Sequence, residues 1–102
     1  MKPTIFGIYG KSNTGKTSLL IKIINKLTTE GYKIACVKIS NKKIEIDKKG
    51  KDSWKYSDAG SKLVVLSSKE ETDFLIKQHE DVEKIINQIS LFDIFDLILI
   101  EG

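Results

Sequence analysis

The apolar residues of this 102-residue chain follow two patterns that alternate along the sequence. Short runs of β-branched or aromatic residues, such as Thr4–Tyr9, indicate buried strands. Stretches in which apolar residues recur every three or four positions, such as Lys16–Glu30, indicate amphipathic helices. This alternation predicts a three-layer α/β fold with a mainly parallel sheet.

The remaining elements are predicted from the same two patterns. The predicted strands are Thr4–Tyr9, Lys33–Ser40, Lys62–Ser68, Asp73–Gln78 and Asp96–Gly102, and the predicted helices are Lys16–Glu30, Asp52–Ala59 and Asp81–Phe92. Gly31 is well placed to end the first helix. Between the second strand and the second helix, the polar segment NKKIEIDKKGKDS predicts a loop or a short hairpin.

The final apolar run, LILI, has the continuous character of a strand that is covered on both faces of a parallel sheet. No helix follows it in the sequence. We therefore expect a chain that is either truncated or completed by dimerisation. The only proline is Pro3, and no repeat or linker is evident, so residues 1–102 are expected to form a single domain.

Composition and charge restrict the classes of protein that the chain can represent. The apolar runs are far too short to cross a bilayer and no signal-peptide segment is evident, so we expect a cytoplasmic protein without membrane contact. Positions 1–51 carry 12 Lys and 3 acidic residues, whereas positions 52–102 carry 5 Lys and 11 acidic residues. Such a basic half suits an anionic ligand. Every basic residue is Lys, so a mechanism that needs an arginine must take it from a partner.

A phosphate-binding motif lies between the first predicted strand and the first predicted helix. Residues Gly10–Thr17 match G-x-x-x-x-G-K-[ST] in full. The two glycines allow a tight turn whose N–H groups face a phosphate, and the following helix adds its partial positive charge. In such loops the Lys16 ammonium reaches the β- and γ-phosphates and the Thr17 hydroxyl binds Mg²⁺. The predicted nucleotide contacts are Gly10, Lys11, Ser12, Asn13, Thr14, Gly15, Lys16, Thr17 and Ser18.

A magnesium nucleotide also requires a carboxylate, which an adjacent parallel strand usually supplies at its C-terminal end. Glu101 follows the final apolar run and occupies this position. Asp47 and Asp52 follow the second strand and are further candidates, with Asp52 preferred. The predicted metal ligands are thus Thr17, Asp52 and Glu101, and the predicted catalytic residues are Lys16 and Glu101.

Lys11 directly follows the first glycine of the loop. It occupies the place of the second lysine in the deviant phosphate loops of dimeric ATPases, where that lysine reaches the partner's nucleotide. A lysine that simply faces solvent is the alternative. The position matters because a chain without arginine could use a lysine from its partner instead.

Four segments, taken in order, resemble the molybdopterin-guanine dinucleotide biosynthesis protein B family: GKSNTGKTSLL, GYKIACVKIS, DKKGKDSWKYSDAGS and DLILIEG. The resemblance covers nearly the whole chain, and its most specific part is GKDSWKYSDAGS. It implies a dimeric P-loop protein that binds GTP and hydrolyses it weakly with Mg²⁺. The implied partners are a second copy of the chain, the guanylyltransferase of the molybdenum cofactor, and molybdopterin.

The resemblance also implies that Gly50, Lys51, Asp52 and Ser53 lie near the nucleotide. The sequence departs from the family in two places. Family members commonly carry histidines after the lysine of the second strand, whereas Lys38 is followed by ISNKK, and the family continues past Gly102. The guanine-reading Asn/Thr-Lys-x-Asp pattern is missing, so the preference for GTP over ATP rests on the resemblance alone.

Two other functions are compatible with the residues. The first is a small P-loop ATPase or kinase of another pathway, although the region after Ser68 offers only scattered lysines for a lid. The second is a nucleic-acid or protein interaction module, in which Trp54 and Tyr56 stack beside lysines. The modest isoelectric point of about 8.9 and the acidic second half disfavour a nucleic-acid partner.

Overall fold

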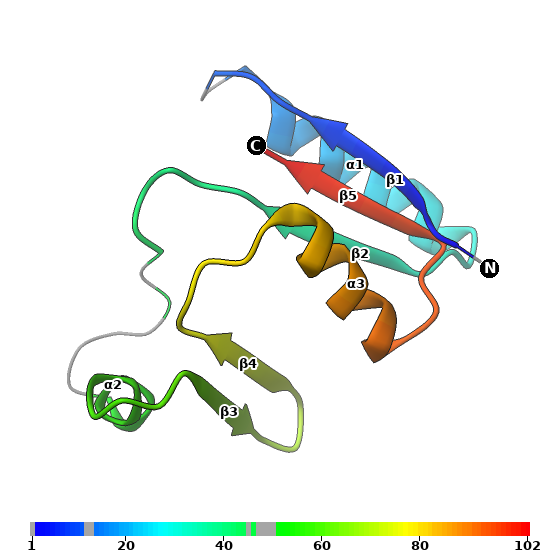
Figure 1. Cartoon of the computed structure of the whole chain (residues 1–102). Coiled ribbons are helices and arrows are strands. Elements are labelled where there is room, and N and C mark those ends of the chain that lie inside the picture. The colour runs from blue at the N-terminus through cyan, green and yellow to red at the C-terminus, as the bar shows by residue number, and fades with distance from the viewer. Residues whose placement is uncertain (1, 12–13, 45, 47–50) are drawn as a thin grey trace. The chain divides into compact units, whose positions relative to one another are not determined.

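The computed structural model describes residues 2–11, 14–44, 46 and 51–102, which form two compact units (Figure 1). The first unit contains residues 1–41 and 81–102, and the second contains residues 42–80. The elements of the first unit are β1 (Thr4–Ile8), α1 (Lys16–Thr29), β2 (Ile34–Lys38), α3 (Val82–Phe92) and β5 (Leu97–Glu101). Those of the second are α2 (Asp52–Asp58), β3 (Leu63–Ser67) and β4 (Thr72–Ile76). The eight predicted elements are all present, with ends that differ by at most two residues.

The sheet of the first unit is parallel and has the order β1-β5-β2. The strand from the end of the chain, β5, lies between the two strands that α1 connects (Figure 1). Its register places Glu101 opposite Ile8 of β1 and Lys38 of β2. The C-terminal ends of all three strands therefore meet at one edge of the sheet, directly beside the loop that follows β1.

The core of the first unit is centred on β5. Ile98, Leu99 and Ile100 are 0%, 1% and 2% exposed. Successive side chains of a strand point to opposite faces, so both faces of β5 are covered, as its unbroken apolar run predicted. Figure 1 shows α1 behind the sheet and α3 in front of it, which gives three layers.

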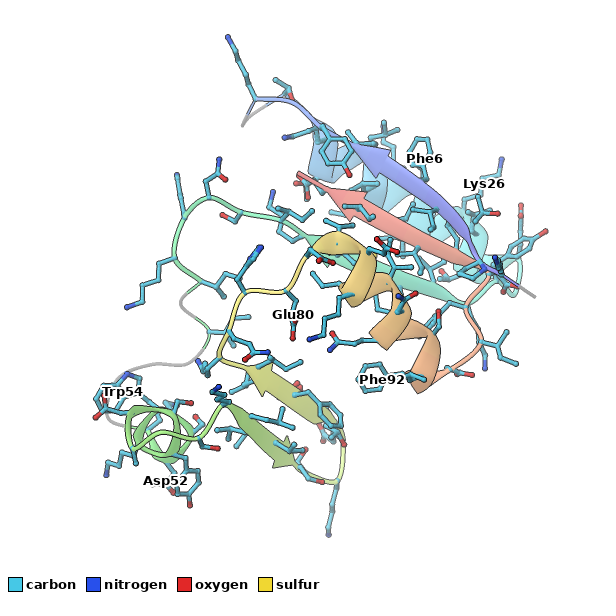
Figure 2. The ribbon with its side chains drawn as sticks, in the orientation of Figure 1. Phe6, Lys26, Asp52, Trp54, Glu80 and Phe92 are labelled. Carbon is cyan, nitrogen blue, oxygen red and sulfur yellow. The ribbon has the colours of Figure 1, made fainter. Side chains whose placement is uncertain are left out.

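The edge strand β1 is much less covered than β5. Its residues Ile5 and Phe6 are 51% and 45% exposed, and Figure 2 marks Phe6 on this strand. In the described part of the chain, β1 pairs with β5 only. The exposed apolar surface of this sheet therefore includes its β1 edge, whereas the central strand β5 is buried.

We expect the Ile98→Ala substitution to lower the free energy of unfolding by about 2–5 kcal/mol, because it leaves a cavity at a fully buried position. Urea denaturation followed by circular dichroism measures this change. The matched control is Ile21→Ala on α1, where the residue is half-exposed and the same deletion removes much less buried surface. Equal losses in the two variants would contradict the assignment of β5 as the core strand.

The second unit consists of α2 and an antiparallel hairpin. The hairpin pairs Leu63 of β3 with Ile76 of β4, and only four residues, 68–71, connect the two strands. A connection this short cannot carry a parallel crossover, so the strands run antiparallel. The Ser68 hydroxyl accepts hydrogen bonds from the backbone N–H groups of Glu70 and Glu71, both at 3.2 Å, which stabilises the turn. None of the helices in the described residues is long and apolar enough to span a bilayer.

An ion pair follows the end of α3. The Lys33 ammonium lies 3.0 Å from Oδ2 of Asp93, the residue that ends the helix. The hydrogen bond from Lys33 lowers the pKa of Asp93, and a second hydrogen bond from the backbone N–H of Ile94 lowers it further. The folded state therefore favours the ionised carboxylate.

This pair predicts a pH-dependent contribution to stability. Because the pKa of Asp93 is lower in the folded than in the unfolded chain, the contribution is present above the unfolded pKa of about 3.9 and is lost as the pH falls through the folded pKa. We expect Asp93→Asn to destabilise the protein near pH 7 and to match the wild type at strongly acidic pH, as measured by urea midpoints. In a Lys33→Met background the difference should shrink at neutral pH, and an undiminished difference would contradict the role of the pair.

Candidate nucleotide-binding site

The loop between β1 and α1 reaches the helix through Gly15. This residue has φ 83° and ψ 10°, a left-handed conformation that glycine adopts without strain, and a Cβ atom here would meet no other heavy atom within 4 Å. Glycine is therefore required for its conformation and not for lack of space. Among the described residues, no side chain caps the start of α1. N–H groups at the start of a helix suit an anion.

The Lys16 side chain joins the start of the loop to the end of β5. Its Nζ atom donates hydrogen bonds to the backbone oxygens of Gly10 at 2.5 Å and Gly102 at 2.6 Å. Within the loop, the Thr14 hydroxyl donates to the backbone oxygen of Lys11 at 2.8 Å. The lysine ammonium is therefore fixed at the edge of the sheet, beside the turn that precedes α1.

The Glu101 carboxylate lies directly beside the first turn of α1. The Thr17 hydroxyl donates to its Oε1 atom at 2.7 Å, and the Lys38 ammonium lies 3.3 Å from the same atom. The hydrogen bond from Thr17 lowers the pKa of Glu101, and Lys38 and Lys16 lower it further, although partial burial opposes them. The site therefore favours the ionised form of Glu101, a residue that is 9% exposed as a whole.

Mg²⁺ is the metal that a P-loop site implies, and the residues present fit it. Thr17 and Glu101 provide two oxygen donors in direct contact with each other. In the part of the chain that the structure describes, no three His, Cys, Asp or Glu side chains converge on a metal site. Mg²⁺ typically binds one or two carboxylates and completes its coordination with water and substrate phosphates. The pair would hold the ion in that way.

The structure brings together most of the predicted site residues. Gly10, Lys16, Thr17 and Glu101 meet at one edge of the sheet, and Ser18 lies in the first turn of α1. Ser12 and Asn13, two predicted phosphate contacts, lie outside the described residues, as do Asp47 and Gly50.

Asp52 begins α2 in the second unit, together with the buried Ser53. Its assignment to the metal stays a prediction. Lys38 is a site residue that sequence reasoning missed. The feature that could have indicated Lys38 is its position at the end of the second strand, because the parallel register aligns that position with Glu101.

A strand, a glycine-containing loop that leads to Lys16, a helix, and a carboxylate on the neighbouring parallel strand define the P-loop class of nucleotide-binding folds. Within this class the chain belongs to the family of molybdopterin guanine dinucleotide synthesis protein B, MobB, whose sequence profile matches residues 5–102. The resemblance identified from the sequence is thus confirmed.

Known proteins support both the family and the fold. Two relatives are the molybdopterin-guanine dinucleotide biosynthesis adapter protein of Haemophilus influenzae and a putative one of Methanocaldococcus jannaschii. The first is 35% identical over 100 residues and the second 35% over 98. Each alignment covers 96% of this chain, but 56% and 40% of the respective relative. The crystal structure of Bacillus subtilis MobB shares the fold with a TM-score of 0.82 at 24% identity, over 97% of this chain and 60% of that one.

Proposed function

We propose that this protein is a GTP-binding accessory protein in molybdenum cofactor maturation, acting in the synthesis of molybdopterin guanine dinucleotide. The observation that carries the nucleotide-binding part is the contact of Thr17 with Glu101 beside the ammonium of Lys16. The pathway is proposed from the family and from relatives that are named as adapter proteins of this biosynthesis. We propose the cytoplasm, where GTP is supplied, as its location.

Each part of the site has a distinct task in nucleotide binding. The N–H groups at the start of α1 and the backbone of the loop that precedes it would bind the phosphates. Lys16 would neutralise the β- and γ-phosphates, and Thr17 and Glu101 would hold Mg²⁺. When bound, Mg²⁺ supplies charge that compensates the phosphate oxygens.

The same residues favour retention of the nucleotide over its rapid hydrolysis. The sequence contains no arginine that could stabilise a transition state in phosphoryl transfer. The Glu101 carboxylate accepts a hydrogen bond from Thr17 and forms an ion pair with Lys38. Because both contacts stabilise its ionised form, it is poorly suited to take a proton from water as a base. We therefore propose at most slow GTP hydrolysis.

Further proposals concern the partners of the protein. A homodimer, the molybdenum cofactor guanylyltransferase and molybdopterin are proposed as partners from the family, and Asp52 is proposed as an additional residue near the metal. The exposed Lys11 follows the first glycine of the loop, where it could serve a partner's nucleotide in a dimer. The mass of the protein in solution, measured with and without Mg·GTP, tests the dimer, and a monomer in both conditions would contradict it.

Reconstitution tests the proposed pathway role. The guanylyltransferase, molybdopterin and Mg·GTP are combined with or without this protein, and the dinucleotide product is quantified by chromatography. We expect the protein to increase the yield of product, and we expect the Lys16→Ala variant to give no increase. A yield that the wild-type protein leaves unchanged would contradict the accessory role and leave nucleotide binding as a separate question.

A further inference from the structure

Lys38 is a charged residue at the site for which the phosphate-loop motif provides no role. It ends β2, and the parallel register aligns it with Glu101. Its ammonium lies 3.3 Å from Oε1 of Glu101, while its side chain is 61% exposed and that of Glu101 is 11% exposed. The lysine is therefore the exposed partner of a nearly buried carboxylate.

The ammonium of Lys38 and the hydroxyl of Thr17 contact the same oxygen, Oε1 of Glu101. Thr17 donates to Oε1 at 2.7 Å, so the hydroxyl and the ammonium lie within two hydrogen-bond lengths of each other. A divalent cation held by Thr17 and Glu101 would repel a positive charge at this distance. Because its flexible stem is largely solvated, Lys38 can leave the carboxylate at little cost.

The strongest anion that Lys38 would then meet is the phosphate that shares the metal with Thr17. Lys16 is already fixed between the backbone oxygens of Gly10 and Gly102, at the edge where the β- and γ-phosphates would lie. The ammonium of Lys38 adds a second positive charge at this same edge of the sheet, from the end of β2. Since the sequence has no arginine, a lysine must perform this task if the chain itself does so.

We propose that Lys38 is a specificity-determining residue that leaves Glu101 when Mg²⁺ binds and contacts the terminal phosphate of a nucleoside triphosphate. This inference rests on the proposed function and extends it. Lys38 makes the site distinguish a triphosphate from a diphosphate, which has no third phosphate for the lysine to contact. The ion pair with Glu101 is the resting state of the residue.

Calorimetry with Lys38→Met tests this inference. Affinities are measured for a non-hydrolysable GTP analogue and for GDP, both with Mg²⁺. We expect the substitution to lower the ratio of triphosphate to diphosphate affinity about tenfold, because one charge-assisted hydrogen bond is lost, and to leave GDP affinity within about twofold of the wild type. Lys38→Arg keeps the charge and should restore most of the ratio.

The matched control is Lys33→Met. Lys33 also forms an exposed ion pair, with Asp93 at 3.0 Å, but it precedes β2 and so lies at the opposite edge of the same sheet. The Lys33→Met substitution should leave the ratio of triphosphate to diphosphate affinity unchanged. Thermal unfolding verifies that each variant is folded, and Lys38→Gln replaces Lys38→Met if that variant is not.

The same titrations in EDTA separate phosphate recognition from a structural role. Without a divalent cation Lys38 remains on Glu101, so the substitution should change the ratio much less. An equal ratio in wild type and Lys38→Met with Mg²⁺, or a wild-type protein that binds both nucleotides equally well, would overturn the inference while the proposed function stands. A wild-type protein that binds neither nucleotide would instead overturn the proposed function.

Discussion

Replacing Lys16 with alanine is expected to abolish measurable triphosphate binding. The Lys16 ammonium is fixed by the backbone oxygens of Gly10 and Gly102 at 2.5 Å and 2.6 Å, so its charge is held in place before a nucleotide arrives. Alanine removes this charge and the hydrogen bonds that it would make to two phosphates. Charge-assisted hydrogen bonds of this kind correspond to losses of roughly a hundredfold or more in affinity. Calorimetric titration of Mg·GTP into the variant measures the loss.

The control for this experiment is Lys22→Ala, which removes an exposed lysine from the same helix. It changes the net charge equally but leaves the loop and β5 intact, so affinity should stay within about twofold of the wild type. Circular dichroism confirms that both variants retain their helices. An unchanged affinity in Lys16→Ala would refute the assignment of the nucleotide site.

The second large effect is expected for Glu101→Gln. The amide keeps the shape of the side chain and can still accept the hydrogen bond from Thr17, but it loses the charge that attracts Mg²⁺. We expect the nucleotide to remain bound, whereas the gain in affinity on adding Mg²⁺ falls about tenfold and GTP hydrolysis decreases. Titrations of GTP in Mg²⁺ and in EDTA, together with phosphate release, measure the two effects.

Glu30→Gln is the matched control, because this exposed glutamate caps the opposite end of α1. The same loss of charge at that position should leave the Mg²⁺ dependence unaltered. If Glu101→Gln kept the full response to Mg²⁺, Glu101 could not be a metal ligand. If it lost nucleotide binding in EDTA as well, its role would be to support the loop.

Local patterns were sufficient to predict the elements of this fold. The helical spacing before Gly31 and the unbroken run before Glu101 each follow from residues close together in the sequence, and the structure confirms both elements. The phosphate-loop motif, Gly10–Thr17, could likewise be recognised from one short stretch of the sequence. Glu101 could be proposed as a site residue because an acidic residue after a buried parallel strand lies at the carboxyl edge of the sheet.

Features that depend on long-range register were not predictable in this way. The order β1-β5-β2 aligns Lys38 with Glu101, and no pattern within the sequence specifies that the second strand also pairs with the last one. The hydrogen bond from Lys16 to Gly102 joins residues that are 86 positions apart, so local patterns could not predict it either. Asp52, chosen from its position after the second strand, stays a prediction because it belongs to the second unit.

Titration of Mg·GTP into the purified wild-type protein measures whether Lys16, Thr17 and Glu101 form a site for a magnesium nucleoside triphosphate. We expect saturable heat with one nucleotide per chain, and a clearly weaker affinity when EDTA removes the metal. The absence of binding to any magnesium nucleoside triphosphate, in protein shown to be folded, would contradict this site assignment.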